Sequence, residues 1–254
     1  MLPHSSHVAV VAGAGSGVGR AVVLKLAAEG WCVALAGRRT EPLAETIALA
    51  GPGGASRLAA FKCDVGDAAA VQRLRDDVLA RFSRVDAVVA AAGTNTPHRS
   101  WTELTAEKYH ELLAANLHGA FYCVQAFLPG MKTHGAGTFV FINSEAGLRA
   151  SIKSGAGYVA AKFGLAGLAQ SLNAEEHAHG IRACSLFPGD IDTALLDQRP
   201  HPPAADIRAR MLQPEDVAAC VWLALSLPPR AVIEDLVIRP TYQLVAKPMP
   251  SASG

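Results

Sequence analysis

The sequence predicts an α/β fold, doubly wound around one parallel sheet of seven strands and built in three layers of helix, sheet and helix. Three observations carry this prediction. Short apolar runs of strand length alternate along the chain with segments of helical periodicity. The first run leads through a glycine-rich turn directly into a helix. The length of 254 residues suits one undivided domain, so we expect residues 1–254 to fold as a unit.

The expected elements follow from residue type and spacing. The strands are apolar runs rich in β-branched residues, at Val8–Val11, Cys32–Ala36, Leu58–Cys63, Ala87–Ala91, Thr138–Asn143, Arg182–Phe187 and Leu236–Ile238. The helices are segments whose apolar residues recur at helical spacing, at 18–29, 41–50, 67–82, 105–132, 155–179 and 214–226. The glycines and proline of GPGG at 51–54 predict a turn between the second helix and the third strand.

Residues 190–213 fit neither pattern. This segment holds Pro200, Pro202 and Pro203 with several charges, and it lacks a long apolar period. It leaves the carboxyl end of a strand, where open α/β sheets bind their ligands. We therefore interpret it as a lid over a substrate site, with a plain surface loop as the alternative.

The composition excludes several classes of protein. Half of the residues are hydrophobic, the net charge is +1 and no run of Lys and Arg appears, which argues against a nucleic-acid-binding surface. The longest apolar stretches are too short to span a membrane, and the N-terminus MLPHSSH lacks a signal pattern, so we expect a cytoplasmic protein. Five scattered cysteines without a C-x-x-C pair predict buried, reduced thiols, and neither they nor the histidines have the spacing of a metal site.

A glycine turn follows the first strand. Gly13, Gly17 and Gly19 form the pattern G-x-x-x-G-x-G, and the commoner G-x-G-x-x-G does not fit from any glycine here. Glycines let the backbone approach a pyrophosphate closely, and the helix that begins there offers free N–H groups with a partial positive charge. We interpret this turn, which includes Ser16 and Val18, as a dinucleotide site. The alternative is a flexible glycine turn.

Tyr158 and Lys162 lie four residues apart, which places both side chains on one face of a helix. A lysine charge held there lowers the pKa of a tyrosine from its usual value of about 10, so that the tyrosine becomes a usable acid or base near neutral pH. Ser144 ends an apolar run fourteen residues earlier and can hydrogen-bond a carbonyl oxygen or the alkoxide formed from it. The three groups suit carbonyl–alcohol interconversion. Alone, Tyr-x-x-x-Lys also fits a helix with a half-buried tyrosine and a solvated lysine.

Together with Asn116 and the segment Pro188–Thr193, these motifs resemble the short-chain dehydrogenase/reductase family in its compact single-domain form. The motifs occur in the family's order, and the resemblance covers roughly residues 7 to 240. It implies a Rossmann-like fold and an oxidoreductase that transfers a hydride between a nicotinamide cofactor and a small alcohol or carbonyl substrate. In that reading Tyr158 is the general acid/base, Lys162 also bonds the nicotinamide ribose, and Ser144 orients the substrate oxygen.

The resemblance implies roles for further residues. Asn116 would help hold a water that links Lys162 to solvent, although bonding to the helix backbone is the simpler account of a buried asparagine. The gap from Ser144 to Tyr158 is one residue longer than is usual in the family, which predicts a small insertion within 147–157. Glu145 is the rival at the shorter register; a carboxylate is a poor oxyanion donor, and we expect Glu145 to contact the substrate instead. The other expected cofactor contacts are Asp64, Val65, Ala92, Gly93, Tyr158, Lys162, Pro188, Gly189, Ile191 and Thr193.

The end of the second predicted strand indicates the cofactor. NAD sites commonly carry an acidic residue here for the ribose hydroxyls, and the first acid downstream is Glu41. Arg38 and Arg39 stand there instead and can grip a 2′-phosphate through charge-assisted bonds. In the family, a basic residue at the position of Arg38 indicates NADP. We therefore expect NADP, with NAD as a second possibility and two solvated arginines as the alternative.

We interpret the chain as an NADP-dependent oxidoreductase of small molecules, with Glu145, Leu148, Arg149, Ile152 and the 190–213 segment around the substrate. A catalytically silent cofactor-binding sensor or scaffold, and an epimerase or dehydratase, are the alternatives. The intact Ser144, Tyr158 and Lys162 argue against the first, and the few residues after Thr193 against the second. The helices at 105–132 and 155–179 are apolar around much of their circumference, which predicts a homo-oligomer, a tetramer or a dimer.

Overall fold

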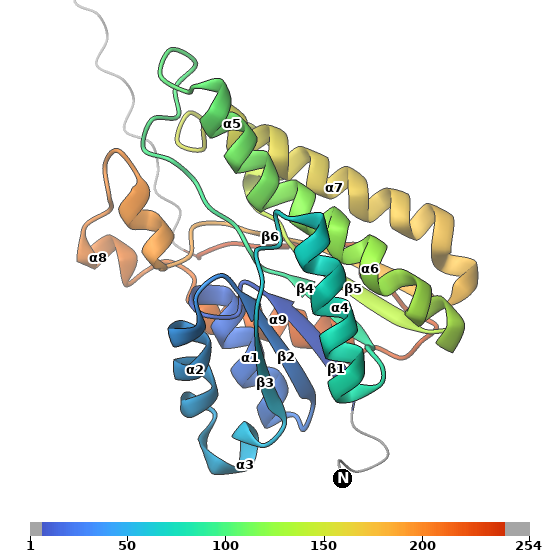
Figure 1. Cartoon of the computed structure of the whole chain (residues 1–254). Coiled ribbons are helices and arrows are strands. Elements are labelled where there is room, and N and C mark those ends of the chain that lie inside the picture. The colour runs from blue at the N-terminus through green and yellow to red at the C-terminus, as the bar shows by residue number, and fades with distance from the viewer. Residues whose placement is uncertain (1–6, 242–254) are drawn as a thin grey trace, which may run out of the picture.

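Seven parallel strands form one sheet in the computed structural model, which describes residues 7–241 (Figure 1). The strands are β1 Val8–Ala12, β2 Cys32–Gly37, β3 Leu58–Lys62, β4 Ala87–Ala90, β5 Gly137–Ile142, β6 Ile181–Pro188 and β7 Asp235–Ile238. Their order across the sheet is β3-β2-β1-β4-β5-β6-β7, and every neighbouring pair is parallel. The predicted doubly wound α/β fold is therefore confirmed.

Helices connect the strands and cover both faces of the sheet (Figure 1). The α-helices are α1 Gly17–Ala28, α2 Thr40–Leu49, α3 Gly51–Ala55, α4 Ala68–Phe82, α5 Ala106–Leu113, α6 Gly119–His134, α7 Ala156–Glu176, α8 Ala205–Arg208 and α9 Pro214–Ser226. Short helical turns of other kinds are η1 Ala114–His118, η2 Glu145–Gly147, η3 His177–His179 and η4 Ala194–Gln198.

The hydrophobic core is split into two layers because successive side chains of a strand point to opposite faces of the sheet. On β1, Val8 and Val10 belong to one layer, whereas Ala9 and Val11 belong to the other. The first layer is completed by buried residues of α4, α6 and α7, and the second by residues of α1, α2 and α9. Helices thus cover both faces of the central strands, as a parallel sheet requires, whereas the edge strands β3 and β7 keep exposed residues.

Two local features differ from the sequence prediction. The 51–54 segment is not a plain turn: Gly51 takes a positive φ of +66°, which redirects the chain, and Pro52 then stands in the first turn of the short helix α3. The predicted helix at 105–132 is interrupted by the π-helical segment η1, which separates α5 from α6. Apolar residues continue at helical spacing through and around this segment, so the pattern does not reveal the wider turn.

The order of the strands places a crevice at the carboxyl ends of β1 and β4. From β1 the chain winds outward to β2 and β3, and from β4 it winds the other way to β5, β6 and β7. Connections that leave neighbouring strands in opposite directions open a binding crevice between them. The glycine turn, Ser144 and residues 189–193 all follow the carboxyl ends of strands and therefore meet at this edge.

Two predictions concern the chain as a whole. Within residues 7–241, no helix is long and apolar enough to cross a membrane. Within the same residues no cysteine forms a disulfide, and four of the five are buried as their apolar contexts predict, whereas Cys220 is partly exposed.

Candidate active site

The glycine turn is held in one conformation by close packing. Gly13 has a positive φ of +81°, and a Cβ there would lie 2.7 Å from the backbone nitrogen of Ala92 in the loop after β4. A Cβ on Gly19 would lie 2.2 Å from the carbonyl oxygen of Gly13. Neither position has room for a side chain, so the close packing of the turn requires glycine at both.

The turn ends at an uncapped helix N-terminus. Ser16 stands at the N-cap of α1 but makes no capping hydrogen bond, and no acidic residue lies in the first turn of the helix. The free N–H groups and the positive end of the helix therefore suit an anion such as a pyrophosphate. A Cβ on Gly17 would lie 3.3 Å from Cγ2 of Thr193, so the segment after β6 reaches this N-terminus. Two predicted cofactor-contacting segments come together here.

The other predicted adenosine contacts lie at the ends of β2 and β3. Arg38 and Arg39 are exposed, and across residues 7–241 neither guanidinium forms a hydrogen bond or ion pair. Oδ1 of Asp64 accepts a hydrogen bond of 3.0 Å from the backbone N–H of Gly66, while Val65 beside it is buried. The two arginines are therefore available to a phosphate, and Asp64 sits in a local turn.

Ser144 and Tyr158 meet across the end of β5 and the first turn of α7. The Ser144 hydroxyl accepts a hydrogen bond of 3.2 Å from the backbone N–H of Ala146, and it also hydrogen-bonds the Tyr158 side chain. Both residues line the same pocket. The predicted pair of oxygen-binding groups is thus assembled within the fold.

The pKa of Tyr158 is raised above its usual value. Burial is the largest cause, and the hydrogen bond from Ser144 and the charges of Arg199 and Arg99 lower it only in part. The side chain is nevertheless partly accessible at the pocket wall, so a substrate oxygen can reach it. The phenol in this arrangement is a proton donor rather than a phenolate.

Lys162 does not supply the lowering of the Tyr158 pKa that the spacing predicts. Its Nζ lies 5.4 Å from the centroid of the Tyr158 ring and donates a hydrogen bond of 2.9 Å to the carbonyl oxygen of Ile142. The side chain is only 3% exposed, and burial lowers the pKa of Lys162 to about 8. The lysine thus lies over the ring face, and its own charge is disfavoured by the same burial that affects the tyrosine.

Asn116 joins the long helix to the loop after β4. It is buried in η1, and its Nδ2 donates hydrogen bonds of 2.9 Å to the carbonyl oxygens of Leu112 and Thr94. Its Oδ1 accepts a hydrogen bond of 3.3 Å from the backbone N–H of Thr94, and a Cβ on Gly93 would lie 2.9 Å from that oxygen. The side chain is therefore fully used by backbone groups, and Gly93 permits its close approach.

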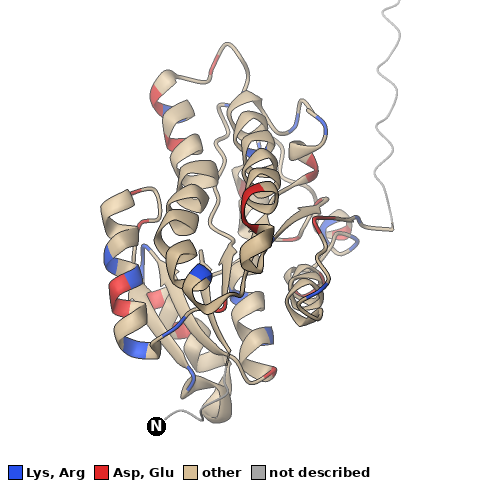
Figure 2. Cartoon of the chain, turned by 90° about the vertical axis from the view of Figure 1, so that its right-hand side faces the viewer, with Lys and Arg blue, Asp and Glu red and all other residues tan. Residues whose placement is uncertain are grey.

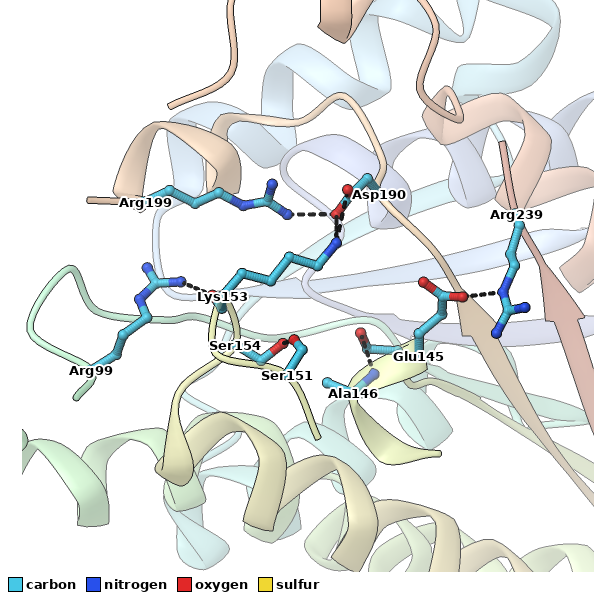
Figure 3. Close-up of polar contacts among 10 residues, drawn as sticks. Arg99, Glu145, Ala146, Ser151, Lys153, Ser154, Asp190, Arg199 and Arg239 are labelled. Atoms are coloured by element: carbon cyan, nitrogen blue, oxygen red, sulfur yellow. Dashed lines mark hydrogen bonds and ion pairs between the residues drawn. The ribbon is translucent and has the colours of Figure 1, made fainter. Parts of the chain in front are cut away.

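A pocket of about 850 Å³ opens beside Ser144 and Tyr158. Its wall includes the predicted residues Glu145, Leu148, Arg149, Pro188, Gly189, Ile191 and Thr193, and nine residues of the 190–213 segment border it. Ile152 is fully exposed and does not line it. Glu145 is ion-paired with Arg239, which follows β7 (Figure 3). The predicted substrate and nicotinamide residues thus surround one cavity.

A network of polar contacts holds the 190–213 segment against the loop before α7 (Figure 3). Asp190 accepts hydrogen bonds of 2.9 Å from Nζ of Lys153 and 2.7 Å from Nη2 of Arg199. Burial alone would raise the pKa of Asp190, but these two partners outweigh it and hold the pKa below its usual value. Arg99 donates hydrogen bonds of 2.8 Å to the carbonyl oxygen of Lys153 and 2.7 Å to that of Gln198.

The sequence did not single out Arg99, Lys153, Asp190 or Arg199 as a group. Each is an isolated charge in a loop, and the fold alone brings residues 99, 153 and 199 together. The only signal in the sequence was the concentration of charges in and before the 190–213 segment, which does not identify partners.

A close-packed glycine turn at the switch point of the sheet, beside a pocket that holds Ser144 and Tyr158, is the arrangement expected of a nucleotide-dependent oxidoreductase. Comparison with known proteins agrees. The sequence model of the short chain dehydrogenase family matches residues 7–203. The chain therefore belongs to the short-chain dehydrogenase/reductase family, as the motifs predicted, and it is an oxidoreductase of that family.

Similar proteins span nearly the whole chain. The (3R)-3-hydroxyacyl-CoA dehydrogenase of Canis lupus familiaris is 34% identical over 233 residues, which are 87% of this chain and 90% of the relative. The D-threitol dehydrogenase of Mycolicibacterium smegmatis is 34% identical over 246 residues, which are 93% of this chain and 93% of the relative. The alcohol dehydrogenase of Thermococcus sibiricus, solved with 5-hydroxy-NADP, has a TM-score of 0.84 and 30% identity over 96% of this chain and all of the other.

Proposed function

We propose that the protein interconverts a small alcohol and its carbonyl compound with NADP(H), and that Tyr158 is the general acid/base. The observation that carries the proposal is the hydrogen-bonded pair of Ser144 and Tyr158 in a pocket that reaches Thr193 at the N-terminus of α1. Similar proteins solved with NADP support the cofactor, among them a metagenomic short-chain oxidoreductase with 28% identity.

The residues of the crevice fit this cofactor. The pyrophosphate would bind at the turn that contains Gly13 and Gly19, against the free N–H groups of α1. A side chain at either glycine would clash with backbone atoms and disrupt the turn. Arg38 and Arg39 would hold the 2′-phosphate through charge-assisted bonds. Residues 188–193 would border the nicotinamide. NADP(H), when bound, supplies the hydride exchange.

The side chains of the pocket would handle the proton. In the direction of carbonyl reduction, the Tyr158 hydroxyl donates its proton to the substrate oxygen, which Ser144 orients through a second hydrogen bond. The raised pKa of Tyr158 keeps the phenol protonated and suits this direction. Lys162, which lies over the ring face, would stabilise the phenolate that remains on Tyr158. Asn116 would help hold the water that links Lys162 to solvent, through which a proton returns to Tyr158.

Three further assignments belong to the proposal. Residues 190–213 would act as a lid, because they border the pocket and are held by the polar network of Figure 3. The protein would be a homo-oligomer, a tetramer or a dimer, in the cytoplasm. The epimerase or dehydratase alternative is disfavoured because residues 194–241 form only η4, α8, α9 and β7 and no second domain.

A panel of ketones and aldehydes, followed by the absorbance of NADPH, tests the proposal. With any compound that is reduced, Ser144→Ala should lower kcat/KM by about a hundredfold, the loss typical of an oxyanion donor. Ser171→Ala is a matched control, because Ser171 is an exposed serine of α7 that does not line the pocket and donates a hydrogen bond to Glu175. NADPH binding without oxidation of NADPH by any compound would favour the sensor or scaffold alternative.

A further inference from the structure

The wall of the pocket carries more positive than negative side chains. Its cationic residues are Arg99, Arg149, Lys153, Arg199, Arg210 and Arg239, and its acidic residues are Glu145 and Asp190. Both carboxylates are already engaged, Glu145 by one arginine and Asp190 by a lysine and an arginine. A cavity with this excess of positive charge attracts an anion.

Arg99 is a buried cation of the pocket wall that has no acidic partner in the described part of the chain. The residue is only 7% exposed, and its guanidinium donates to the carbonyl oxygens of Thr96, Lys153 and Gln198 at 2.7, 2.8 and 2.7 Å. Across residues 7–241 it pairs with no carboxylate. A buried cation without a counter-ion is costly unless the site gains from its field. The fold therefore fixes a positive charge at the pocket wall.

Of the two arginines Arg99 and Arg199, Arg199 is the more accessible. One of its nitrogens bonds Asp190, and the guanidinium forms no other hydrogen bond or ion pair in the described part of the chain, so most of its donors remain for a ligand. Its charge lies close enough to Arg99 to lower the pKa of that residue, although burial is the larger cause. The charges of both arginines also act on the Tyr158 hydroxyl. An anion that neutralised them would lie in the same pocket as the Tyr158 hydroxyl.

We infer that Arg199, supported by the fixed charge of Arg99, binds a carboxylate of the substrate, so that the enzyme acts on oxo or hydroxy acids in preference to neutral carbonyl compounds. This inference rests on the proposed function, because it assigns the substrate of the same pocket. The carboxylate would stand near the reacting carbon, because Arg99, Arg199 and Tyr158 line the same pocket. The phosphates of a coenzyme A thioester would lie too far along the ligand to use them.

Matched ligands test the inference by binding, independently of turnover. The NADP⁺-loaded protein is titrated by calorimetry with 2-oxobutanoate, 3-oxobutanoate and 3-oxooctanoate, each beside its own amide. We expect at least one acid to bind more tightly than its amide by about tenfold or more, the effect of one charge-assisted contact. Arg199→Gln should remove that difference. If no acid binds more tightly than its amide, the inference is overturned.

A matched control separates the carboxylate site from the stability of the segment. Arg208 also holds residues 190–213, through Asp192 and Asp197, but does not line the pocket. Arg208→Gln should therefore leave the acid-to-amide ratio unchanged, whereas Arg199→Gln collapses it. Equal ratios in the two variants would contradict the inference.

Turnover distinguishes this inference from the function on which it rests. An acid that binds with the expected preference, yet is not reduced by NADPH, would keep the carboxylate site and contradict the proposed function. Reduction of neutral ketones or of 3-oxobutanoyl-CoA with higher kcat/KM than every acid would support the proposed function and contradict the carboxylate site.

Discussion

Lys162 should make the stability of the cofactor-free protein rise with pH in alkaline solution. Burial lowers the pKa of Lys162 from 10.5 to about 8. Below pH 8 the lysine is protonated in both the folded and the unfolded chain. Between pH 8 and 10.5 only the unfolded chain keeps the proton, so the unfolded state binds more protons and the free energy of unfolding rises with pH. The difference in pKa corresponds to roughly 3 kcal/mol over this window.

The variant Lys162→Met isolates this contribution. Methionine fills a similar volume without a titrating group, so the other ionisable residues cancel when the two pH profiles are subtracted. The variant also leaves the carbonyl oxygen of Ile142 without its donor, which lowers stability by about 1–3 kcal/mol at every pH. The pH-independent offset and the pH-dependent gain are therefore separable.

Urea unfolding at one protein concentration, at pH 7 and at pH 10.5, measures the effect. The free energy of unfolding of the wild type, relative to Lys162→Met, should increase by roughly 3 kcal/mol between these pH values. Lys108→Met is the control, because Lys108 is exposed and its profile should run parallel to the wild type. Parallel profiles for wild type and Lys162→Met would refute the reasoning, since the buried lysine would then titrate as it does in the unfolded chain.

Other predictions concern the cofactor, the turn and assembly. NADPH should bind about tenfold more tightly than NADH by fluorescence titration, and the double change of Arg38 and Arg39 to Gln should abolish the preference; equal wild-type affinities would contradict the assignment. Gly19→Ala places a methyl group 2.2 Å from a backbone oxygen and should lower Tm and abolish cofactor binding, whereas Gly130→Ala, with open space around it, should do neither. The long helices α6 and α7 carry few charges (Figure 2), and the exposed Phe163 lies on α7. Light scattering should therefore show an oligomer, and Phe163→Asp should weaken its assembly. A monomeric wild-type protein would contradict this prediction.

The sequence predicts what local spacing and residue type determine. Strands and helices follow from the alternation of apolar runs, and the glycine turn follows from residues within one short segment. Tyr158 and Lys162 share a helix face because a spacing of four dictates it. These features need no knowledge of which distant segments meet, so the fold and the core of the site can be predicted from local patterns alone.

The features that the sequence does not predict depend on distant segments or on burial. Arg99 and Arg199 lie far apart along the chain, and the fold alone brings both charges to the pocket that Tyr158 lines. The spacing of Tyr158 and Lys162 predicts proximity but not solvent exposure, and burial reverses the expected direction of the tyrosine pKa. The π-helical turn around Asn116 likewise has no distinct pattern in the sequence.

Tyr158→Phe tests the central claim most directly. The ring still packs over Lys162 and only the hydroxyl is lost, so the fold and NADPH affinity should be close to those of the wild type. The rate of NADPH oxidation with the best carbonyl substrate should fall by at least about a hundredfold, since the proposed mechanism assigns the proton transfer to the Tyr158 hydroxyl. A variant that keeps most of the wild-type rate, with NADPH still bound, would show that Tyr158 is not the general acid/base.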